Sequence, residues 1–204
     1  MDTNLKNEAD SLMRIAGKVR GEVILNRINF IRQKEGEGAE KKIEDKLAHL
    51  GYPLDFGAVS SLGWYSEAHS ILIIIAAKEI FGWDDQVIYD MGGFSPKISF
   101  IVKLLMNLVS LEYTFNAAPK SWRKHHTAGD LESTEYNDAK KILYLRLRNF
   151  KFHPVYCRYL CGYFAEIARL AIYKGRKGDS SSIMVEETKC VFKGDDYDEY
   201  KITW

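Results

Sequence analysis

The hydrophobic period of the sequence changes near residue 140, and this change constrains the fold more than any other feature. In the stretch KKILYLRLRNF, Leu143, Leu145 and Leu147 alternate with polar or aromatic residues, which is typical of a half-buried β-strand. Before this stretch, apolar residues recur mainly every three or four positions, as they do along amphipathic helices. The pattern therefore predicts an α+β protein with a helical N-terminal half and a C-terminal sheet.

The same spacing predicts the helices of the N-terminal half, which cover residues 21–36, 39–52, 64–82 and 95–115. The third helix contains ILIIIAA, which is apolar on all sides and indicates a central, buried position. Pro96 suits the first turn of the fourth helix, because the N–H that proline lacks is left unbonded there. The polar residues 1–20 are expected to be a loose arm or a short helix.

A further helix and a closing hairpin are predicted after residue 150. Residues 153–175 return to helical spacing, and two strand-like stretches, 182–194 and 198–204, follow around the turn GDDYD. By strand alternation, one face of the hairpin is expected to meet the core through Met184, Cys190, Phe192, Tyr200, Ile202 and Trp204. The opposite face suits water and carries Glu187, Lys189, Glu199 and Lys201.

Composition favours one soluble domain, which we expect to cover residues 21–204. A chain of 204 residues is within the roughly 250 that one hydrophobic core can serve. The net charge of +1 argues against a nucleic-acid-binding protein. The most apolar stretch, ILIIIAAKEIF, is about half the roughly 20 residues that a bilayer requires, so no transmembrane segment is expected. The N-terminus lacks the apolar core of a signal peptide and the three cysteines form no disulfide framework, which favours a cytoplasmic location.

The order of these elements resembles the haem-nitric oxide/oxygen binding (H-NOX) superfamily. The resemblance rests on RGEVILNRINF, WYSEA, MGGFSPKISFI, SWRKHHTAGD, HPVYCRYLCGYF and the tail KCVFKGDDYDEYKITW. It is greatest to haem-less relatives, namely the 4-vinyl reductase-type domains and a group of uncharacterised bacterial proteins often found in myxobacteria. The resemblance implies a helical half packed on an antiparallel sheet of about four strands with one inserted helix, and a ligand cavity between the long helix, residues 95–115, and the sheet.

The resemblance also implies that haem is not bound. H-NOX domains hold the haem iron through a histidine on the long helix, and Glu112 stands at that position in this sequence. A carboxylate is a poor substitute for the neutral imidazole that haem iron takes. Because Glu112 falls within the apolar arc of its predicted helix, it is either an edge residue paired with an arginine or a polar anchor inside a cavity.

Further cavity residues are expected from the first strand of the sheet and from the surrounding helices. H-NOX domains bind the haem propionates through Tyr-x-Ser-x-Arg, and Tyr144, Arg146 and Arg148 match two of these three positions. They share one strand face, so their guanidinium groups can converge on an anion; the alternative is a basic face in contact with water. The expected apolar wall consists of Ile71, Leu108, Phe115, Phe164 and Trp204.

The cysteines and histidines allow a metal site but do not require one. Cys157 and Cys161 share a helix face with apolar residues, and Cys190 faces inward from the hairpin. Core packing is the favoured interpretation; the alternatives are a redox switch, or zinc if a fourth ligand is present. The 4-vinyl reductase-type tail usually has a second cysteine where this sequence has Asp198 or a neighbour, which weakens the zinc interpretation.

The segment KSWRKHHTAGD is predicted to be an extended, solvated connection. Its adjacent histidines, at positions 125 and 126, would then point to opposite faces and not share a metal. Contact with a phosphate group is the alternative role for this basic segment.

Three functions are compatible with the sequence. The favoured one is a sensory or regulatory domain that binds a hydrophobic or amphipathic ligand without haem. The alternative is a protein–protein interaction scaffold, as in vesicle-tethering subunits of the same fold. This scaffold would dock a signalling partner or a second copy of the chain through exposed aromatic residues, namely Tyr52, Trp83, Tyr89 and Tyr113. A reductase-like enzyme is the least favoured, because no nucleotide-binding motif and no acid–base pair is found.

Overall fold

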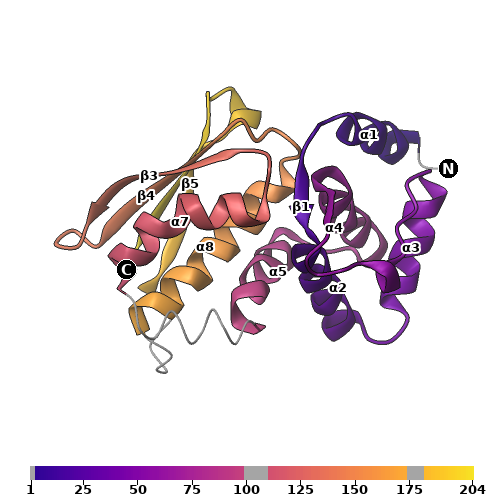
Figure 1. Cartoon of the computed structure of the whole chain (residues 1–204), viewed down its shortest axis with the longest axis horizontal. Helices are drawn as coiled ribbons and strands as arrows, with labels where there is room; N and C mark the ends of the chain where they lie inside the picture. The colour runs from indigo at the N-terminus through magenta and orange to yellow at the C-terminus, as the bar shows by residue number, and fades with distance from the viewer. Residues whose placement is uncertain (1–2, 99–109, 174–181) are drawn as a thin grey trace.

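The computed structural model describes residues 3–98, 110–173 and 182–204, and these form the α+β fold that the change of period predicts. Helices α1 to α4 make up one half of the molecule, a four-stranded antiparallel sheet lies at the other end, and α5 lies between them (Figure 1). Leu108 and much of the helix predicted over residues 95–115 lie outside the described residues. Among the described helices, none is long and apolar enough to cross a bilayer.

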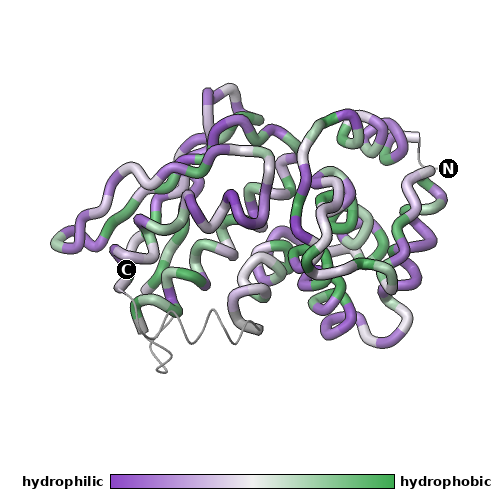
Figure 2. Tube along the Cα trace, viewed as in Figure 1, coloured by the Kyte–Doolittle hydropathy of each residue, from purple (hydrophilic) through white to green (hydrophobic). Residues whose placement is uncertain are grey.

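Three helices of the N-terminal half, α1 (Thr3–Met13), α2 (Gly21–Glu35) and α3 (Ala39–His49), pack around α4 (Glu67–Phe81). As its composition predicts, α4 is buried on nearly all sides from Ala68 to Ala77. The side chain of Ser66 caps its N-terminus, and Gly82 ends it in the left-handed conformation that favours glycine. Figure 2 shows hydrophobic residues where these helices pack together and a largely hydrophilic turn at the far end of the sheet.

The region predicted as one long helix differs from the prediction. Helix α5 (Asp85–Ile98) begins ten residues earlier than expected, with the side chain of Asp84 accepting a hydrogen bond of 3.0 Å from the Val87 N–H. Pro96 lies near the end of α5 and not in a first turn, so the prediction based on it is wrong. Helix α7 (Leu111–His125) covers most of the segment predicted to be an extended connection, so that prediction is also wrong.

Helices α5 and α8 (Val155–Tyr173) cross unusually closely, because each presents a glycine at the crossing point. A Cβ atom at Gly92 would overlap the carbonyl oxygen of Tyr159, and one at Gly162 would overlap the carbonyl oxygen of Tyr89. Only glycine allows two helix backbones to approach in this way. This contact joins the N-terminal helices to the helix that covers the sheet.

The sheet has the strand order β3-β4-β6-β5, with every neighbouring pair antiparallel. Its strands are β3 (Asp130–Asn137), β4 (Ile142–Arg148), β5 (Met184–Lys189) and β6 (Asp198–Thr203). Helix α8 is inserted between β4 and β5 in the chain, and both α7 and α8 lie against the same face of the sheet (Figure 1). The predicted fold class is therefore confirmed, including the inserted helix.

The closing hairpin forms as predicted, but its register places different residues inside. A β-bulge between Glu187 and Lys189 adds a residue to β5, so side chains before the bulge point the opposite way from simple alternation. Met184, predicted to face the core, is 65% exposed, whereas Glu187, predicted to face water, turns inward. Cys190 follows the bulge and is buried as predicted. Glu199 is also buried, where it accepts hydrogen bonds from Arg146 and Thr188.

The aromatic residues predicted to form a docking surface do not share one environment. Tyr113 is 63% exposed, Tyr52 and Tyr89 are half-buried, and Trp83 is only 5% exposed. The Trp83 indole packs edge-on against Phe30 and donates a hydrogen bond of 2.7 Å to Glu35. Trp83 is therefore a core residue, and the prediction that it is exposed is wrong.

Candidate functional site

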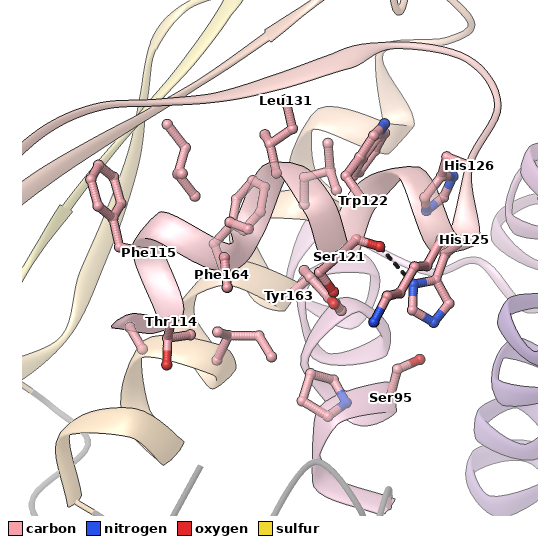
Figure 3. Close-up of a pocket in the computed structure, with 18 of the residues that line it drawn as sticks. Ser95, Thr114, Phe115, Ser121, Trp122, His125, His126, Leu131, Tyr163 and Phe164 are labelled. Atoms are coloured by element: carbon pink, nitrogen blue, oxygen red, sulfur yellow. Dashed lines mark hydrogen bonds between the residues drawn. The ribbon is translucent and has the colours of Figure 1, made fainter. Parts of the chain in front are cut away.

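A cavity of about 450 Å³ lies between α7, α8 and the inner face of the sheet. Its walls are mostly apolar and include the leucines of β4 that alternate inward, with Phe115 from α7 and Phe164 from α8 on facing sides (Figure 3). The volume is within the range of roughly 300 to 1,000 Å³ that small-molecule sites occupy. The cavity lies against the sheet, as the resemblance implies, but its described helical walls are α7 and α8, because most of the predicted long helix lies outside the described residues.

The apolar part of the cavity combines residues that are far apart in the sequence. Leu131 of β3 and Leu143 and Leu145 of β4 form its sheet side, because inward-facing positions on neighbouring antiparallel strands lie opposite one another. Phe164 and Ala168 are one helical turn apart on α8 and form the facing side. An apolar ligand entering this space would be removed from water on several sides at once.

The polar end of the cavity is formed where α7 ends. His126 follows the last residue of α7 and is 8% exposed, with its ring stacked on Trp122 at 4.0 Å between centroids. Its Nδ1 lies 2.8 Å from Oε2 of Glu67, the first residue of α4, which is fully buried. His125, the neighbouring residue, is half-exposed and instead contacts the carbonyl oxygen of Ser121 at 2.9 Å. The prediction that this segment is solvated is therefore wrong for His126.

The predicted anion anchors lie on the other face of the sheet. Tyr144, Arg146 and Arg148 point away from the cavity, because the leucines between them point into it. Nε of Arg146 donates to Glu199 at 2.7 Å, and Nε of Arg148 donates to Glu132 at 3.2 Å. Both guanidinium groups also lie over the ring of Tyr197. This is the basic, outward-facing strand surface of the alternative interpretation, although its charges are largely paired.

Two further predicted site residues also lie away from the cavity. Glu112 is exposed in the first turn of α7. Trp204 is half-buried at the end of β6, where it stacks on Tyr136 with 5.9 Å between the ring centroids. It therefore helps to cover the sheet, as its terminal position predicts, without lining the cavity.

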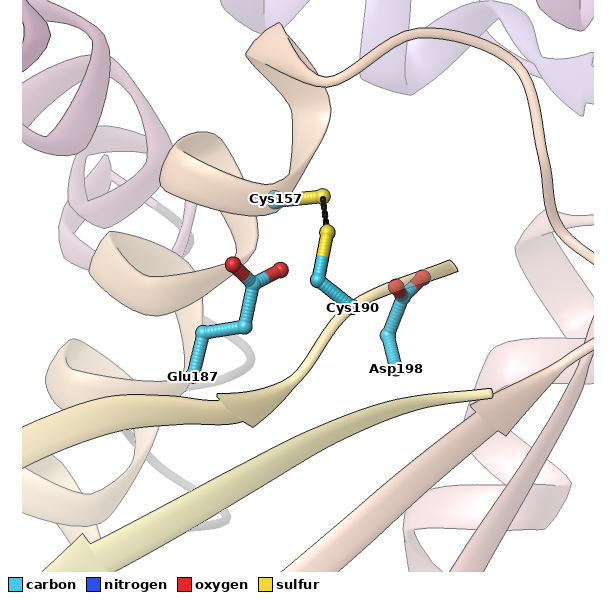
Figure 4. Close-up of side chains that lie close together, drawn as sticks. All are labelled: Cys157, Glu187, Cys190 and Asp198. Carbon is cyan, nitrogen blue, oxygen red and sulfur yellow. Dashed lines mark hydrogen bonds between the residues drawn. The ribbon is translucent and has the colours of Figure 1, made fainter. Parts of the chain in front are cut away.

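A second candidate site lies under the hairpin, where two thiols and two carboxyl groups converge (Figure 4). Cys157 comes from the first turn of α8, Glu187 from β5, Cys190 from the end of the bulge, and Asp198 from the start of β6. One ligand atom from each lies within 4.8 Å of all the others, and the two sulfur atoms are 3.9 Å apart. Cys161 is buried one turn further along α8 and does not belong to this group.

Burial dominates the electrostatics of this thiol–carboxyl cluster. It raises the pKa values of Cys157 and Cys190 above the usual thiol range, with the charge of Glu187 adding to the effect. Burial also raises the pKa of Asp198 to about 6, although the Val191 N–H donates a hydrogen bond of 2.8 Å to its carboxylate. One oxygen of Glu187, Oε1, is buried without a hydrogen-bond partner among the described residues. The cluster therefore holds several acidic groups and too few donors to satisfy them.

Sequence reasoning missed three of the residues that complete these sites. Glu67 gave no signal beyond its place at a predicted helix start, and Glu187 was assigned to water because the bulge cannot be read from the sequence. Asp198 or a neighbour stands where the resemblance to the 4-vinyl reductase-type tail would place a cysteine, so the sequence argues against zinc there. The spacing of Cys190 and Asp198 across a tight turn was the available signal, since such a turn returns both side chains to one place.

The fold defined by these elements is that of the H-NOX domains. No protein-family model matches the chain, and no curated protein matches it in sequence. A mutant H-NOX protein from K. algicida, in the Fe(II) unliganded form, matches with a TM-score of 0.60 at 10% identity, over 90% of this chain and 95% of that chain. An oxygen-binding H-NOX domain related to soluble guanylate cyclases matches with a TM-score of 0.58 at 14% identity, over 90% of this chain and 94% of that chain. An H-NOX protein from S. oneidensis matches with a TM-score of 0.53 at 14% identity, over 89% of this chain and 94% of that chain.

Proposed function

We propose that this chain is a sensory domain that binds a small apolar or amphipathic molecule in the cavity between α7, α8 and the sheet, without haem. The observation that carries the proposal is the cavity itself, because a core of this kind is normally packed without large voids. Pockets of about 450 Å³ with mostly apolar walls are typical of sites that bind small apolar molecules. The similarity to an oxygen-binding H-NOX domain supports the proposal at the level of the fold.

The residues of the chain do not fit haem in the way that the superfamily resemblance would require. The residue at the expected iron-ligand position, Glu112, is an exposed carboxylate on α7. The residues matched to the propionate anchors, Tyr144, Arg146 and Arg148, lie on the outer face of the sheet. His126 is the buried histidine of the cavity, and its Nδ1 contacts Glu67. These placements support a ligand other than haem.

A signal can arise because helices from both halves of the molecule border the cavity. Ser95 and Pro96 of α5 reach its edge, and α5 is joined to α8 through the close glycine crossing. A ligand that fits one arrangement of α5, α7 and α8 better than another shifts the population toward it.

The test is native mass spectrometry of the purified full chain, compared with its denatured mass. We expect an additional organic mass that is lost on denaturation, or, if the ligand is lost during purification, a thermal shift with fatty alcohols and fatty acids. A haem-sized mass with a haem absorption spectrum would refute haem independence. The absence of any bound mass, together with no thermal shift from any apolar probe, would refute the cavity function.

As a second function we propose that the thiol–carboxyl cluster binds a structural zinc ion. Tetrahedral zinc with Zn–S bonds of about 2.3 Å places two sulfur atoms about 3.8 Å apart, and those of Cys157 and Cys190 are 3.9 Å apart. Glu187 and Asp198 supply oxygen ligands at the remaining corners, and the unpartnered Oε1 of Glu187 would gain a partner. The thiolates favour zinc over magnesium or calcium, which prefer oxygen ligands alone.

Zinc binding is tested by the metal content of the wild-type chain and of two cysteine variants. Cys157→Ser removes a proposed ligand, whereas Cys161→Ser changes a buried thiol on the same helix outside the cluster. We expect about one zinc per chain in the wild type and in Cys161→Ser, and a large loss in Cys157→Ser. Equal zinc content in the two variants, or none in the wild type after zinc is supplied, would refute the assignment.

A further inference from the structure

The polar end of the cavity has a hydrogen-bonding pattern that restricts what the ligand can be. His126 lines the cavity, and its Nδ1 lies 2.8 Å from Oε2 of Glu67. An ionised carboxylate only accepts hydrogen bonds, so Nδ1 carries the proton and donates it to Glu67. In the neutral ring the other nitrogen, Nε2, is then an acceptor. Among the described residues, the hydrogen bond of the His126 ring is the one at Nδ1, so the Nε2 edge is left for a ligand of the cavity that His126 lines.

The core around Glu67 also holds a buried cation. Glu67 is fully buried, and Arg27 on α2 is 1% exposed, with its guanidinium over the rings of Tyr156 and Tyr159 at 5.2 and 4.8 Å. Burial lowers the pKa of Arg27, but the two tyrosines and the charge of Glu67 outweigh it, so the pKa is raised overall and the guanidinium remains charged. Arg27 is therefore a buried positive charge in the surroundings of Glu67.

Trp122 fixes the orientation of this acceptor. Its indole stacks on the His126 ring with an angle of 15° between the planes, and its Nε1–H is already bonded to the carbonyl oxygens of Ala128 and Gly129. The indole therefore offers a ligand an apolar face but no free donor. Within this group of His126, Trp122 and Glu67, the cavity presents one oriented acceptor beside apolar walls.

We infer that the ligand is an apolar molecule bearing a hydroxyl group, which donates a hydrogen bond to Nε2 of His126. This inference rests on the proposed cavity function and makes it more specific. Glu67 is a positioning residue, because it holds the tautomer and the orientation of the ring without touching the ligand. A carboxylate ligand fits less well, because it would bring a second acceptor toward Nε2.

The position of His126 also connects this contact to the N-terminal half. His126 forms a β-bridge with Val19 of β1 (Lys18–Arg20), and the next residue, Thr127, donates its N–H to the carbonyl oxygen of Lys18 at 2.9 Å. Glu67 begins α4 and donates its own N–H to the carbonyl oxygen of Gly17. A ligand bound to His126 thus contacts the point where both halves of the molecule are hydrogen-bonded together.

The test compares probes that differ mainly in the hydrogen-bond donor. 1-Octanol and 1-methoxyheptane are isomers of similar size, but only the alcohol can donate a hydrogen bond; octanoate supplies an anionic head group of similar length. Binding to the full chain is measured by isothermal titration calorimetry. A net hydrogen bond contributes about 1 kcal/mol, so we expect the alcohol to bind roughly five- to tenfold more tightly than the ether. We expect octanoate to bind more weakly than the alcohol.

Two variants separate the acceptor from the fold. In His126→Asn the amide nitrogen can take the place of Nδ1 and keep the bond to Glu67, while nothing replaces Nε2. We expect this variant to lose its preference for the alcohol over the ether, whatever its absolute affinity for the two probes. His49→Asn changes an exposed histidine on α3 in the same way, and we expect the preference to remain.

Each outcome decides between the inference and the cavity function on which it rests. Equal affinity of the wild type for alcohol and ether would overturn the inference and leave the cavity function intact. A preference for octanoate would also overturn the inference, because it would show that the polar end of the cavity binds an anion in preference to a hydroxyl group. An alcohol preference that survives in His126→Asn would assign the acceptor to another residue. No binding of any probe up to its solubility limit would refute both proposals.

Discussion

The affinity of the thiol–carboxyl cluster for zinc should increase steeply with pH. Zinc binds thiolates, and burial keeps the pKa values of Cys157 and Cys190 raised, so both thiols are protonated in the metal-free chain between pH 7 and 8. Asp198, with a pKa raised to about 6, is already ionised in that range. Two protons must therefore leave for each zinc bound. The apparent association constant should rise about 100-fold per pH unit, which corresponds to about 2.7 kcal/mol.

At pH values below the pKa of Asp198, the affinity for zinc should depend on pH more steeply. The Asp198 carboxyl group, with its pKa of about 6, takes up a third proton as the pH falls. The apparent constant should then approach a change of about 1,000-fold per pH unit below roughly pH 5.5. Cobalt(II) should show the same trend, with the sulfur-to-metal charge-transfer absorption of a thiolate site.

The assay is competition for zinc with a chromophoric chelator at a series of pH values, corrected for the protonation of the chelator itself. Calorimetric titration in buffers of different ionisation enthalpy counts the released protons independently. The Cys157→Ser variant should release at most one thiol proton. A wild-type affinity independent of pH between 7 and 8, or the release of fewer than one proton per zinc, would falsify the assignment of both cysteines as ligands.

Three further predictions concern stability, and each is measured by chemical denaturation of the purified chain. Gly92→Ala should destabilise it by about 3 kcal/mol or more, because the new Cβ would overlap a carbonyl oxygen of α8. Gly93→Ala is the matched control, because its Cβ would lie 3.4 Å from the nearest atom. Alanine's higher helix propensity should leave the stability of this variant unchanged or raise it by up to about 1 kcal/mol. Equal losses of stability in the two variants would contradict the close crossing of α5 and α8. Ala168→Leu should be neutral or stabilising by up to about 2 kcal/mol if the cavity is empty, and should weaken probe binding, whereas a loss of 1–3 kcal/mol would indicate a filled core. Arg27→Met should lower the free energy of unfolding by about 3–5 kcal/mol, because it removes a buried positive charge near the buried Glu67. Adding Glu67→Gln to this variant should recover part of the lost stability. No recovery would show that the charges of Arg27 and Glu67 are not coupled.

Local pattern predicted most of the secondary structure, and the exceptions have identifiable causes. The alternating leucines of β4 and the all-apolar α4 were assigned correctly, because burial imposes a period that the sequence displays directly. Pro96 misled the assignment of α5, because it lies inside the helix despite its preference for a first turn, and the true start is capped by Asp84. Helix α7 was underestimated because its second half is basic and offers only Trp122 as a buried apolar residue.

The candidate sites were less predictable than the fold. The cavity was expected between helix and sheet, and Phe115 and Phe164 were correctly placed on it. The anchors were assigned to the wrong face of β4, because a resemblance in sequence order does not fix strand register. A shift of one residue moves every side chain to the opposite face.

The sequence by itself determined the class of the fold, the helix at its centre and the inward position of the cysteines, since each depends on a period read within one segment. Tertiary structure alone decided which residues meet. Glu67 reaches His126 across 59 positions of the chain, and a single bulge turns Glu187 toward Cys157. Contacts of this kind depend on the register and crossing of whole elements. These are set by packing between segments, and no local pattern records them.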